Sequence, residues 1–164
     1  MDSPGRFTVT INAQNEANEH TIQIFTDGSK HEHGVGSGTA IYIQNKLTHQ
    51  MERKLHDKCS NNQAEQMAIV KALQAIETIK INTNIPRTVK IHTDSRITLE
   101  SLKNMKNHLV DEIRKKTVAL EKEKWNTEYT WIKAHAGNYG NELADRLAKE
   151  AARNSDMLQQ NPKK

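Results

Sequence analysis

Two periods of hydrophobic and polar residues run along this chain, and they predict strands and helices in a definite order. Alternation with a period of two predicts five strands, over residues 22–27, 39–44, 46–55, 88–94 and 127–133. Apolar residues at helical spacing predict four helices. A long helix follows Ser60, a short one follows Ser95, and two more cover residues 109–124 and 138–153. Ser60 and Gln63 have the spacing of a capping box, which marks the start of the first helix.

This order of elements predicts an α/β fold with a five-stranded mixed sheet flanked by helices. The first three strands follow one another closely and predict an antiparallel meander, in which the glycine-rich segment KHEHGVGSG forms the first turn. Each later strand follows a helix, which predicts parallel pairing through helical crossovers. Helices on both faces would then cover the sheet.

The chain of 164 residues is long enough to bury one ordinary core, so we expect a single domain over residues 21–154. Both ends are polar and show little periodicity. We therefore predict a flexible N-terminal arm over residues 1–20 and a disordered tail over 155–164.

Composition excludes several classes of protein. Hydrophobic residues make up 35% of the chain and charged residues 27%, and the apolar runs are too short to cross a bilayer, so no membrane association is expected. Cys59 is the only cysteine, which suits a reducing intracellular compartment such as the cytoplasm or nucleus. A net charge of +4 slightly favours a polyanionic partner, while the aromatic content of 4% disfavours a stacking platform for single strands.

Four carboxylates fall close to the ends of predicted elements. Asp27 and Asp94 end two strands, in TDGS and HTDS, while Glu65 lies in the first turn of the long helix and Asp145 lies in the last helix. Sites in open α/β sheets form beyond the carboxyl ends of strands, and four clustered carboxylates would need cations to offset their repulsion. Oxygen ligands without cysteine suit Mg²⁺ or Mn²⁺. Ordinary surface or capping acids would give the same spacing, so the residues alone leave both interpretations open.

The motifs around these acids resemble those of the type 1 ribonuclease H family, found in bacteria, eukaryotes and reverse-transcribing elements. The resemblance covers about residues 20 to 153 and depends on four motifs in order, because each alone is a weak signal. The first-aspartate motif is matched by FTDGS, the asparagine pair and helix glutamate by SNNQAEQMA, the second aspartate by IHTDS, and the closing histidine loop and helix by WIKAHAGNYGNELADRLA.

This resemblance implies an RNase-H-like fold and an endonuclease that hydrolyses the RNA strand of RNA–DNA hybrids by two-metal-ion catalysis. The implied catalytic residues are Asp27, Glu65, Asp94, His135 and Asp145. The four acids among them would bind two Mg²⁺ ions, for which Mn²⁺ can substitute. His135 would assist proton transfer or product release from the loop before the last helix, although a lone loop histidine is ordinarily a solvent-exposed residue.

The resemblance also implies a substrate-binding set near the start of the long helix and after the first aspartate. Its members are Gly28, Ser29, Ser60, Asn61, Asn62 and Gln63. The amides would reach 2′-hydroxyls and base edges in the minor groove of the hybrid, whereas helix capping is their alternative role. We add Lys103 and Lys106 to this set, because they could partly replace the basic protrusion of bacterial members that is discussed in the next paragraph. The alternative is that they belong to an ordinary solvated basic face.

The sequence departs from the bacterial pattern after the second aspartate. The segment LESLKNMKNHLVDEIRKK is shorter than the basic, Trp-containing protrusion of bacterial members and has no tryptophan. This favours the domain of a retrotransposon or retroviral polyprotein that serves reverse transcription, with a reverse transcriptase domain as a partner and a monomeric state for the isolated domain. The alternatives are a free-standing cellular ribonuclease H, an inactive hybrid-binding module, and another nuclease or an integrase on the same fold. His31 and His33 resemble half of a zinc site, but no further ligands accompany them.

Overall fold

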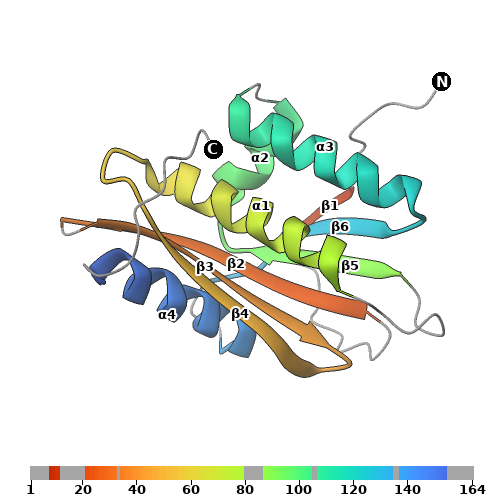
Figure 1. Ribbon diagram of the computed structural model, residues 1–164, viewed down its shortest axis with the longest axis horizontal. Helices are drawn as coiled ribbons and strands as arrows, with labels where there is room; N and C mark the ends of the chain where they lie inside the picture. The colour runs from red at the N-terminus through yellow and green to blue at the C-terminus, as the bar shows by residue number, and fades with distance from the viewer. Residues whose placement is uncertain are drawn as a thin grey trace.

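One mixed sheet of six strands, in the order β1-β6-β5-β2-β3-β4, organises the protein (Figure 1). This computed structural model describes residues 8–11, 21–32, 34–79, 87–104, 107–134 and 137–154, and of residues 8–11 only the backbone. The elements are, in chain order, β1 (Thr8–Ile11), β2 (Thr21–His31), β3 (Gly34–Ile43), β4 (Lys46–Leu55), α1 (Asn61–Thr78), β5 (Thr88–Thr93), α2 (Arg96–Asn104), α3 (His108–Lys122), β6 (Asn126–Trp131) and α4 (Tyr139–Arg153).

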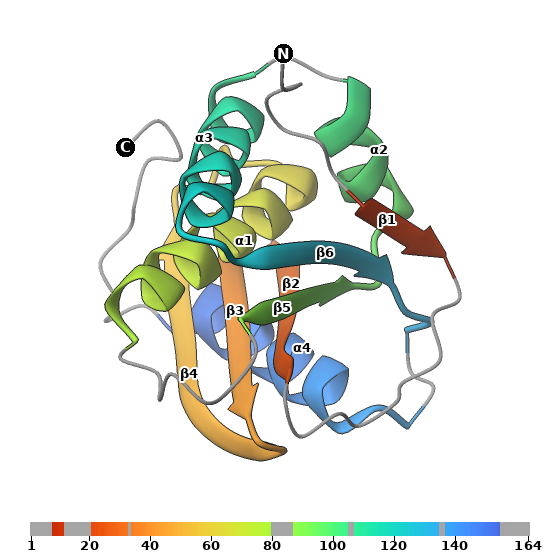
Figure 2. The ribbon, with the colours of Figure 1, turned by 90° about the vertical axis from the view of Figure 1, so that its right-hand side faces the viewer.

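The parallel and antiparallel halves of the sheet meet at β2. This strand pairs antiparallel with β3, which pairs antiparallel with β4, and on its other side it pairs parallel with β5. The parallel half continues from β5 to β6 and from β6 to β1. Helices α1, α2 and α3 lie on one face of the sheet and α4 lies on the other (Figures 1 and 2). The predicted RNase-H-like architecture, an antiparallel meander extended by parallel strands through helical crossovers, is therefore confirmed.

The predicted flexible arm over residues 1–20 is wrong for residues 8–11. These residues form β1, which lies at the edge of the sheet and pairs parallel with β6, with Thr8 opposite Glu128 and Ile11 opposite Trp131 (Figure 2). Four residues give too few positions for alternation to be recognised, and the strand depends on a partner more than a hundred positions away. The other residues of the predicted arm, and the tail predicted over 155–164, lie outside the described residues.

The glycine-rich segment KHEHGVGSG is mostly strand, although its composition predicted a turn. β2 continues to His31 and β3 begins at Gly34. A Cβ on Gly36 would lie 2.4 Å from the Ala148 carbonyl oxygen, and a Cβ on Gly38 would lie 2.3 Å from that of Ala144. These glycines therefore allow the backbone of α4 to pack directly on β3, and the glycine pattern reflects close packing instead of a turn.

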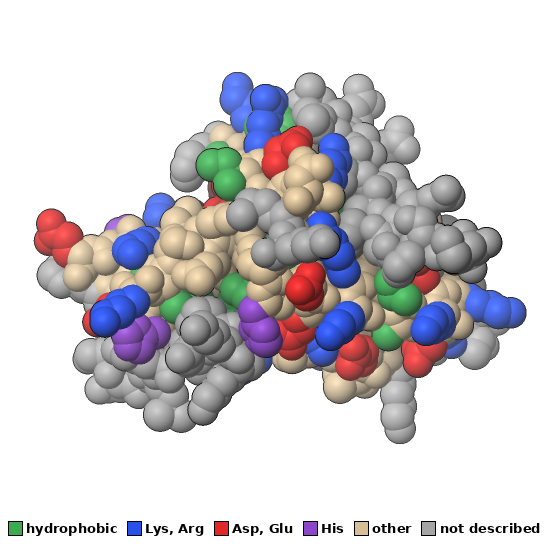
Figure 3. All heavy atoms as spheres, turned by 90° about the horizontal axis from the view of Figure 1, so that it is seen from above, with side chains coloured by type: hydrophobic (Ala, Val, Ile, Leu, Met, Phe, Trp, Pro, Cys, Tyr) green, Lys and Arg blue, Asp and Glu red, His purple; other side chains and the backbone are tan. Residues whose placement is uncertain are grey.

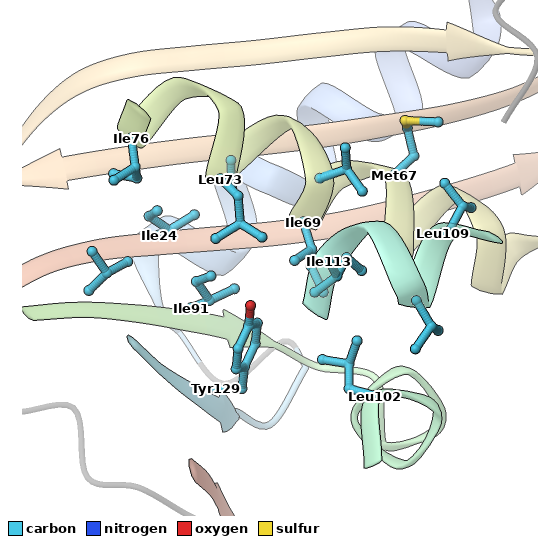
Figure 4. Packing of buried hydrophobic residues seen from close by; sticks show 14 of the residues in the cluster. Ile24, Met67, Ile69, Leu73, Ile76, Ile91, Leu102, Leu109, Ile113 and Tyr129 are labelled. Carbon is cyan, nitrogen blue, oxygen red and sulfur yellow. The ribbon is translucent and has the colours of Figure 1, made fainter. Parts of the chain in front are cut away.

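The main hydrophobic core fills the space between the sheet and helices α1 and α3. Figure 4 shows Ile24 and Ile91 of the sheet facing Leu73 of α1, and all three are fully buried. The buried Tyr129 of β6 satisfies its hydroxyl with a 2.7 Å hydrogen bond to Thr117 of α3. Because such packing holds β2 and β5 beneath α1 with little freedom, residues that leave these elements at one end have defined positions. None of the helices that the structure describes has the length and apolar character needed to cross a membrane.

Candidate active site

The parallel pairing of β2 with β5 brings two of the predicted acids together. The last two register pairs are Phe25 with His92 and Thr26 with Thr93, and Asp27 and Asp94 each follow directly. Both carboxylates therefore extend from the end of the parallel pairing, as we predicted. Asp27 does not end its strand, however, because β2 continues past it in antiparallel pairing with β3.

The start of α1 carries the third acid to the same end of the sheet. The predicted capping box is present, with the Ser60 hydroxyl accepting from the Gln63 N–H at 3.0 Å and the Gln63 side-chain oxygen accepting from the Ser60 N–H at 2.8 Å. Glu65 follows just after the first turn, slightly later than we predicted. A Cβ on Gly28 would lie 2.6 Å from the Glu65 backbone nitrogen, so the glycine lets α1 approach β2 at this point.

The acids form a compact cluster. One carboxylate oxygen from each of Asp27, Glu65 and Asp94 lies within 4.8 Å of the other two, a geometry that could hold a metal ion. Asp145 of α4 joins them through a side-chain hydrogen bond with Asp27, and it also forms a 2.9 Å ion pair with Lys149. Four elements distant in sequence thus deliver the four predicted carboxylates to one place.

Burial makes this cluster electrostatically costly. Removal from water, then repulsion from Asp94 and Glu65, raises the pKa of Asp27 to about 9, against an ordinary value of 3.8. Its hydrogen bond with Asp145 also raises that pKa, whereas the Gly28 N–H donates to the carboxylate at 2.9 Å and lowers it. Burial likewise raises the pKa of Glu65, partly offset by side-chain hydrogen bonds. Acids with raised pKa values and only oxygen ligands to offer fit one or more hard divalent cations such as Mg²⁺ or Mn²⁺.

Thr98 of α2 contacts Glu65 directly, and our sequence reasoning missed it. Its side chain is fully buried, and its hydroxyl lies 2.7 Å from Glu65 Oε2 and 3.0 Å from Asn62 Oδ1. A threonine four positions after Asp94, inside an amphipathic helix, looks like ordinary packing in a sequence. The informative signal would have been a hydroxyl at a core position of the helix that follows the second aspartate.

Trp131 holds the backbone beside Asp94 and was also missed. Its indole N–H donates to the Asp94 carbonyl oxygen at 3.0 Å. The guanidinium of Arg96 lies over the indole ring, 4.3 Å from its centroid, in a cation–π contact. The segment that turns from β5 into α2 is therefore tied to β6 immediately next to the acid cluster.

The predicted substrate-binding residues lie in different environments. Asn61 is an exposed amide at the start of α1, while Asn62 is half-buried against Thr98. Ser29 is buried, and its hydroxyl pairs with His31 Nε2 at 2.9 Å, so its contacts are internal. The amide oxygen of Gln63 is used in the capping box.

The remaining predicted residues are only partly described. Lys103 is exposed in the last turn of α2, whereas Lys106, His135 and His33 lie outside the described residues. On the face shown in Figure 3, the described Lys and Arg side chains are interspersed with Asp and Glu side chains. A concentrated basic surface is therefore not visible among the described residues of that face.

The sequence matches the RNase H family over residues 19–153. Ribonuclease H of Vibrio campbellii is 32% identical over 146 residues, covering 81% of this chain and 90% of the relative. Ribonuclease HI of Vibrio cholerae is also 32% identical over 146 residues, covering 81% of this chain and 89% of the relative.

Solved structures agree with this relationship at the level of the fold. The N-terminal RNase H domain of a Mycobacterium tuberculosis protein, solved as a fusion with maltose binding protein, superposes with a TM-score of 0.60 at 18% identity, covering 80% of this chain and 98% of that one. RNase H1 of Halobacterium salinarum superposes with a TM-score of 0.54 at 20% identity, covering 80% and 96%. The match over most of the chain, and the bacterial relatives above 30% identity, lead to one conclusion. The chain belongs to the ribonuclease H family.

Proposed function

We propose that this protein is an endonuclease that hydrolyses the RNA strand of RNA–DNA hybrids by two-metal-ion catalysis. The observation that carries the proposal is the convergence of four acids from β2, α1, β5 and α4 at one end of the sheet, in a member of the ribonuclease H family. A structural role would not explain why acids are buried together at a cost to stability. A role as cation ligands does explain it.

In the proposed mechanism Asp27, Glu65, Asp94 and Asp145 hold two Mg²⁺ ions, with Mn²⁺ as a substitute. Bound there, such ions would polarise the scissile phosphate and lower the pKa of an attacking water. The protein itself supplies position. The Gly28 N–H orients the Asp27 carboxylate, and the Thr98 hydroxyl orients that of Glu65. Lys149, paired with Asp145, lowers the negative charge of the cluster.

Other predicted residues complete the proposal. His135 would take up or deliver a proton, or assist release of the product, from the segment before α4. Asn61 is the exposed amide best placed to meet 2′-hydroxyls or base edges in the hybrid, and Asn62, Ser60 and Gln63 would support it from the start of α1. Lys103 and Lys106 would contact phosphates.

We also propose that the domain serves reverse transcription inside the cell, as part of a polypeptide that carries a reverse transcriptase. The supporting observation is that α2 ends at Asn104 and α3 begins at His108, which leaves no space for a helical protrusion between them. The relatives reported above are bacterial, which favours a free-standing cellular enzyme as the alternative. Sequencing the transcript would decide, because a frame continuous with a reverse transcriptase supports the proposal and a separate short frame refutes it.

The test of the activity compares labelled RNA–DNA hybrid, double-stranded RNA and double-stranded DNA, each with Mg²⁺, with Mn²⁺ and with EDTA. We expect cleavage of the RNA of the hybrid alone, dependent on the ion, with 5′-phosphate and 3′-hydroxyl products. Equal cleavage of double-stranded RNA would refute the substrate assignment. Binding of hybrid without cleavage under either ion would show an inactive binding module instead.

A further inference from the structure

A pocket of about 280 Å³ lies where residues of β3, β4 and α1 come together, and the nuclease mechanism gives it no role. Its lining includes Ser37, Thr39, Met51, Glu52, Arg53 and Lys71. None of the described lining residues belongs to the acid cluster or to the predicted substrate-binding set. The volume is just below the usual range of about 300 to 1,000 Å³ for small-molecule sites, so the pocket suits a small ligand.

The strand register places Ser37 and Arg53 side by side on the face that α1 covers. The Thr39 hydroxyl donates to the Ala68 carbonyl oxygen of α1 at 3.0 Å. Because side chains alternate along a strand, Ser37, two positions earlier, also faces α1. Arg53 of β4 is the register partner of Ser37, and paired residues share a face of the sheet. Arg53 and Ser37 therefore lie on the same side of the sheet as Lys71 of α1.

Glu52 is the only acid among the described lining residues, and its side chain faces away from α1. Lys54, two positions later, donates from Nζ to the Ala152 carbonyl oxygen of α4 at 2.9 Å, so Glu52 also faces α4. Burial, and then repulsion from Glu150, raises the pKa of Glu52, which agrees with this placement. The side of the pocket that faces α1 is therefore lined by two cations, with no described acid between them.

These two cations are not neutralised by ion pairs. Arg53 and Lys71 are both half-buried, and within the described part of the chain neither forms an ion pair. Burial, and then repulsion from Arg53, lowers the pKa of Lys71. On α3, Glu112 raises that pKa, whereas Lys116 lowers it further and is itself paired with Glu77 at 4.0 Å. An anion bound between Arg53 and Lys71 would offset this repulsion.

The Ser37 hydroxyl supplies a third donor. It makes no hydrogen bond to any described residue, and it is not one of the enclosed polar atoms that lack a partner, so it is open to the pocket. The proton of the Thr39 hydroxyl, by contrast, is already used in the hydrogen bond to α1. The pocket therefore offers a guanidinium, an ammonium and a hydroxyl as donors to one ligand.

We propose that this pocket binds a phosphate group, with the Arg53 guanidinium holding two of its oxygens while the Lys71 ammonium and the Ser37 hydroxyl donate to the others. A guanidinium presents paired N–H donors that match either a phosphate or a carboxylate. A carboxylate has two oxygens in one plane, whereas a tetrahedral phosphate can meet donors from three directions. Two sources carry this chemistry, which are the backbone of a nucleic acid and a free phosphate ion or monoester.

The test titrates inorganic phosphate into the ¹⁵N-labelled full-length protein in EDTA, with chloride adjusted to hold the ionic strength constant. We expect saturable amide shifts at Ser37, Arg53 and Lys71. Lys71→Gln should weaken phosphate binding about tenfold, because it removes a charge-assisted hydrogen bond. Ser37→Ala should weaken it about fivefold, the loss of roughly one neutral donor.

A matched control separates a specific site from general attraction to a basic protein. Lys115→Gln removes the same charge from an exposed position on α3, outside the pocket lining, and should leave phosphate affinity unchanged. Melting in chloride buffer reports on the fold. Lys71→Gln should melt no lower than the wild type there, because it removes a repulsion, and added phosphate should stabilise the wild type more than this variant.

Two further ligands identify the source of the phosphate. Dimethyl phosphate represents the backbone diester, and an RNA–DNA hybrid in EDTA presents that diester without metal-dependent cleavage. Shifts at the pocket with both assign it to a nucleic-acid backbone, whereas shifts with inorganic phosphate alone assign it to a free phosphate or monoester. Because every titration omits the metal, failure of the proposed nuclease activity would leave these results unchanged. The proposal is overturned if none of these ligands gives saturable shifts at the pocket, or if Lys71→Gln and Ser37→Ala bind phosphate as tightly as the wild type.

Discussion

Replacing Asp27 by Asn should make the metal-free protein more stable and abolish cleavage of the hybrid. The change keeps the shape of a side chain that is 5% exposed but removes its ability to ionise. The pKa of Asp27 is about 9 in the folded protein, against an ordinary value of 3.8. The wild type therefore has its full stability, as far as Asp27 is concerned, below pH 3.8, and this contribution is lost as pH rises toward 9. The loss amounts to about 1.4 kcal/mol for each pH unit in this window.

The size of the effect follows from that window. Between pH 3.8 and pH 7 the full linkage would be about 4 kcal/mol in favour of the Asn variant. Water at the half-exposed Asp94 and the Lys149 charge beside Asp145 both reduce it, so we expect about 2 kcal/mol, or a melting temperature raised by roughly 4–8 °C.

Calorimetry in EDTA at several pH values between 4.5 and 8.5 would measure this difference. The stability gain of Asp27→Asn should be small at the acidic end and should grow with pH. Added Mg²⁺ should stabilise the wild type more than the variant, because binding to the folded state alone adds stability. The exposed Asp57 supplies the matched control, since Asp57→Asn should change neither curve. A variant that melts several degrees below the wild type at pH 8, or a gain that does not depend on pH, would refute the reasoning.

Four other changes test separate parts of the account. Thr98→Val keeps the shape but removes the hydroxyl beside Glu65, and we expect the Mg²⁺ concentration for half-maximal cleavage to rise about tenfold. An unchanged Mg²⁺ requirement would contradict a positioning role. His135→Ala should slow single-turnover cleavage without abolishing it, whereas a loss as complete as that of Asp27→Asn would require a more central role. Lys103→Glu together with Lys106→Glu should weaken hybrid binding and flatten its log–log salt dependence by about 0.9 for each lost phosphate contact, and identical slopes would place the contact surface elsewhere. Gly38→Ala should lower the melting temperature, because its Cβ would lie 2.3 Å from the Ala144 carbonyl oxygen, and an unchanged melting temperature would contradict this close packing.

The sequence predicted the elements that carry long, regular patterns. Two periods of apolar residues were enough for α1, α4 and the strands of the meander, and the capping box located the start of α1 at Ser60. β1 was missed because four residues at an edge depend on a distant partner for their structure. The glycines of β3 were misinterpreted because glycine serves both turns and close helix packing, and only the position of α4 distinguishes the two.

The candidate site also has residues that the sequence located and residues that it missed. The carboxylates could be located because strand ends in a parallel sheet share one edge, so Asp27 and Asp94 had to be neighbours once their strands were paired. The groups that orient these carboxylates could not be located from the sequence. Thr98 becomes significant only because its hydroxyl lies 2.7 Å from Glu65 Oε2, and Trp131 only because its indole N–H lies 3.0 Å from the Asp94 carbonyl oxygen.

Gln23 illustrates the limit most sharply. In the sequence it is a polar residue in an alternating strand, where the pattern predicts an exposed side chain. α4 covers this face of β2 and buries the residue. The Gln23 side chain pairs with His92 of β5, whose register partner on β2 is Phe25, and His92 pairs in turn with Thr130 of β6. Polar residues at buried positions of a two-sided sheet must find partners in neighbouring strands, as the Gln23 side chain does with His92. A local pattern cannot identify such a contact, because both the burial of Gln23 and the position of its partner depend on how the whole sheet is paired and covered.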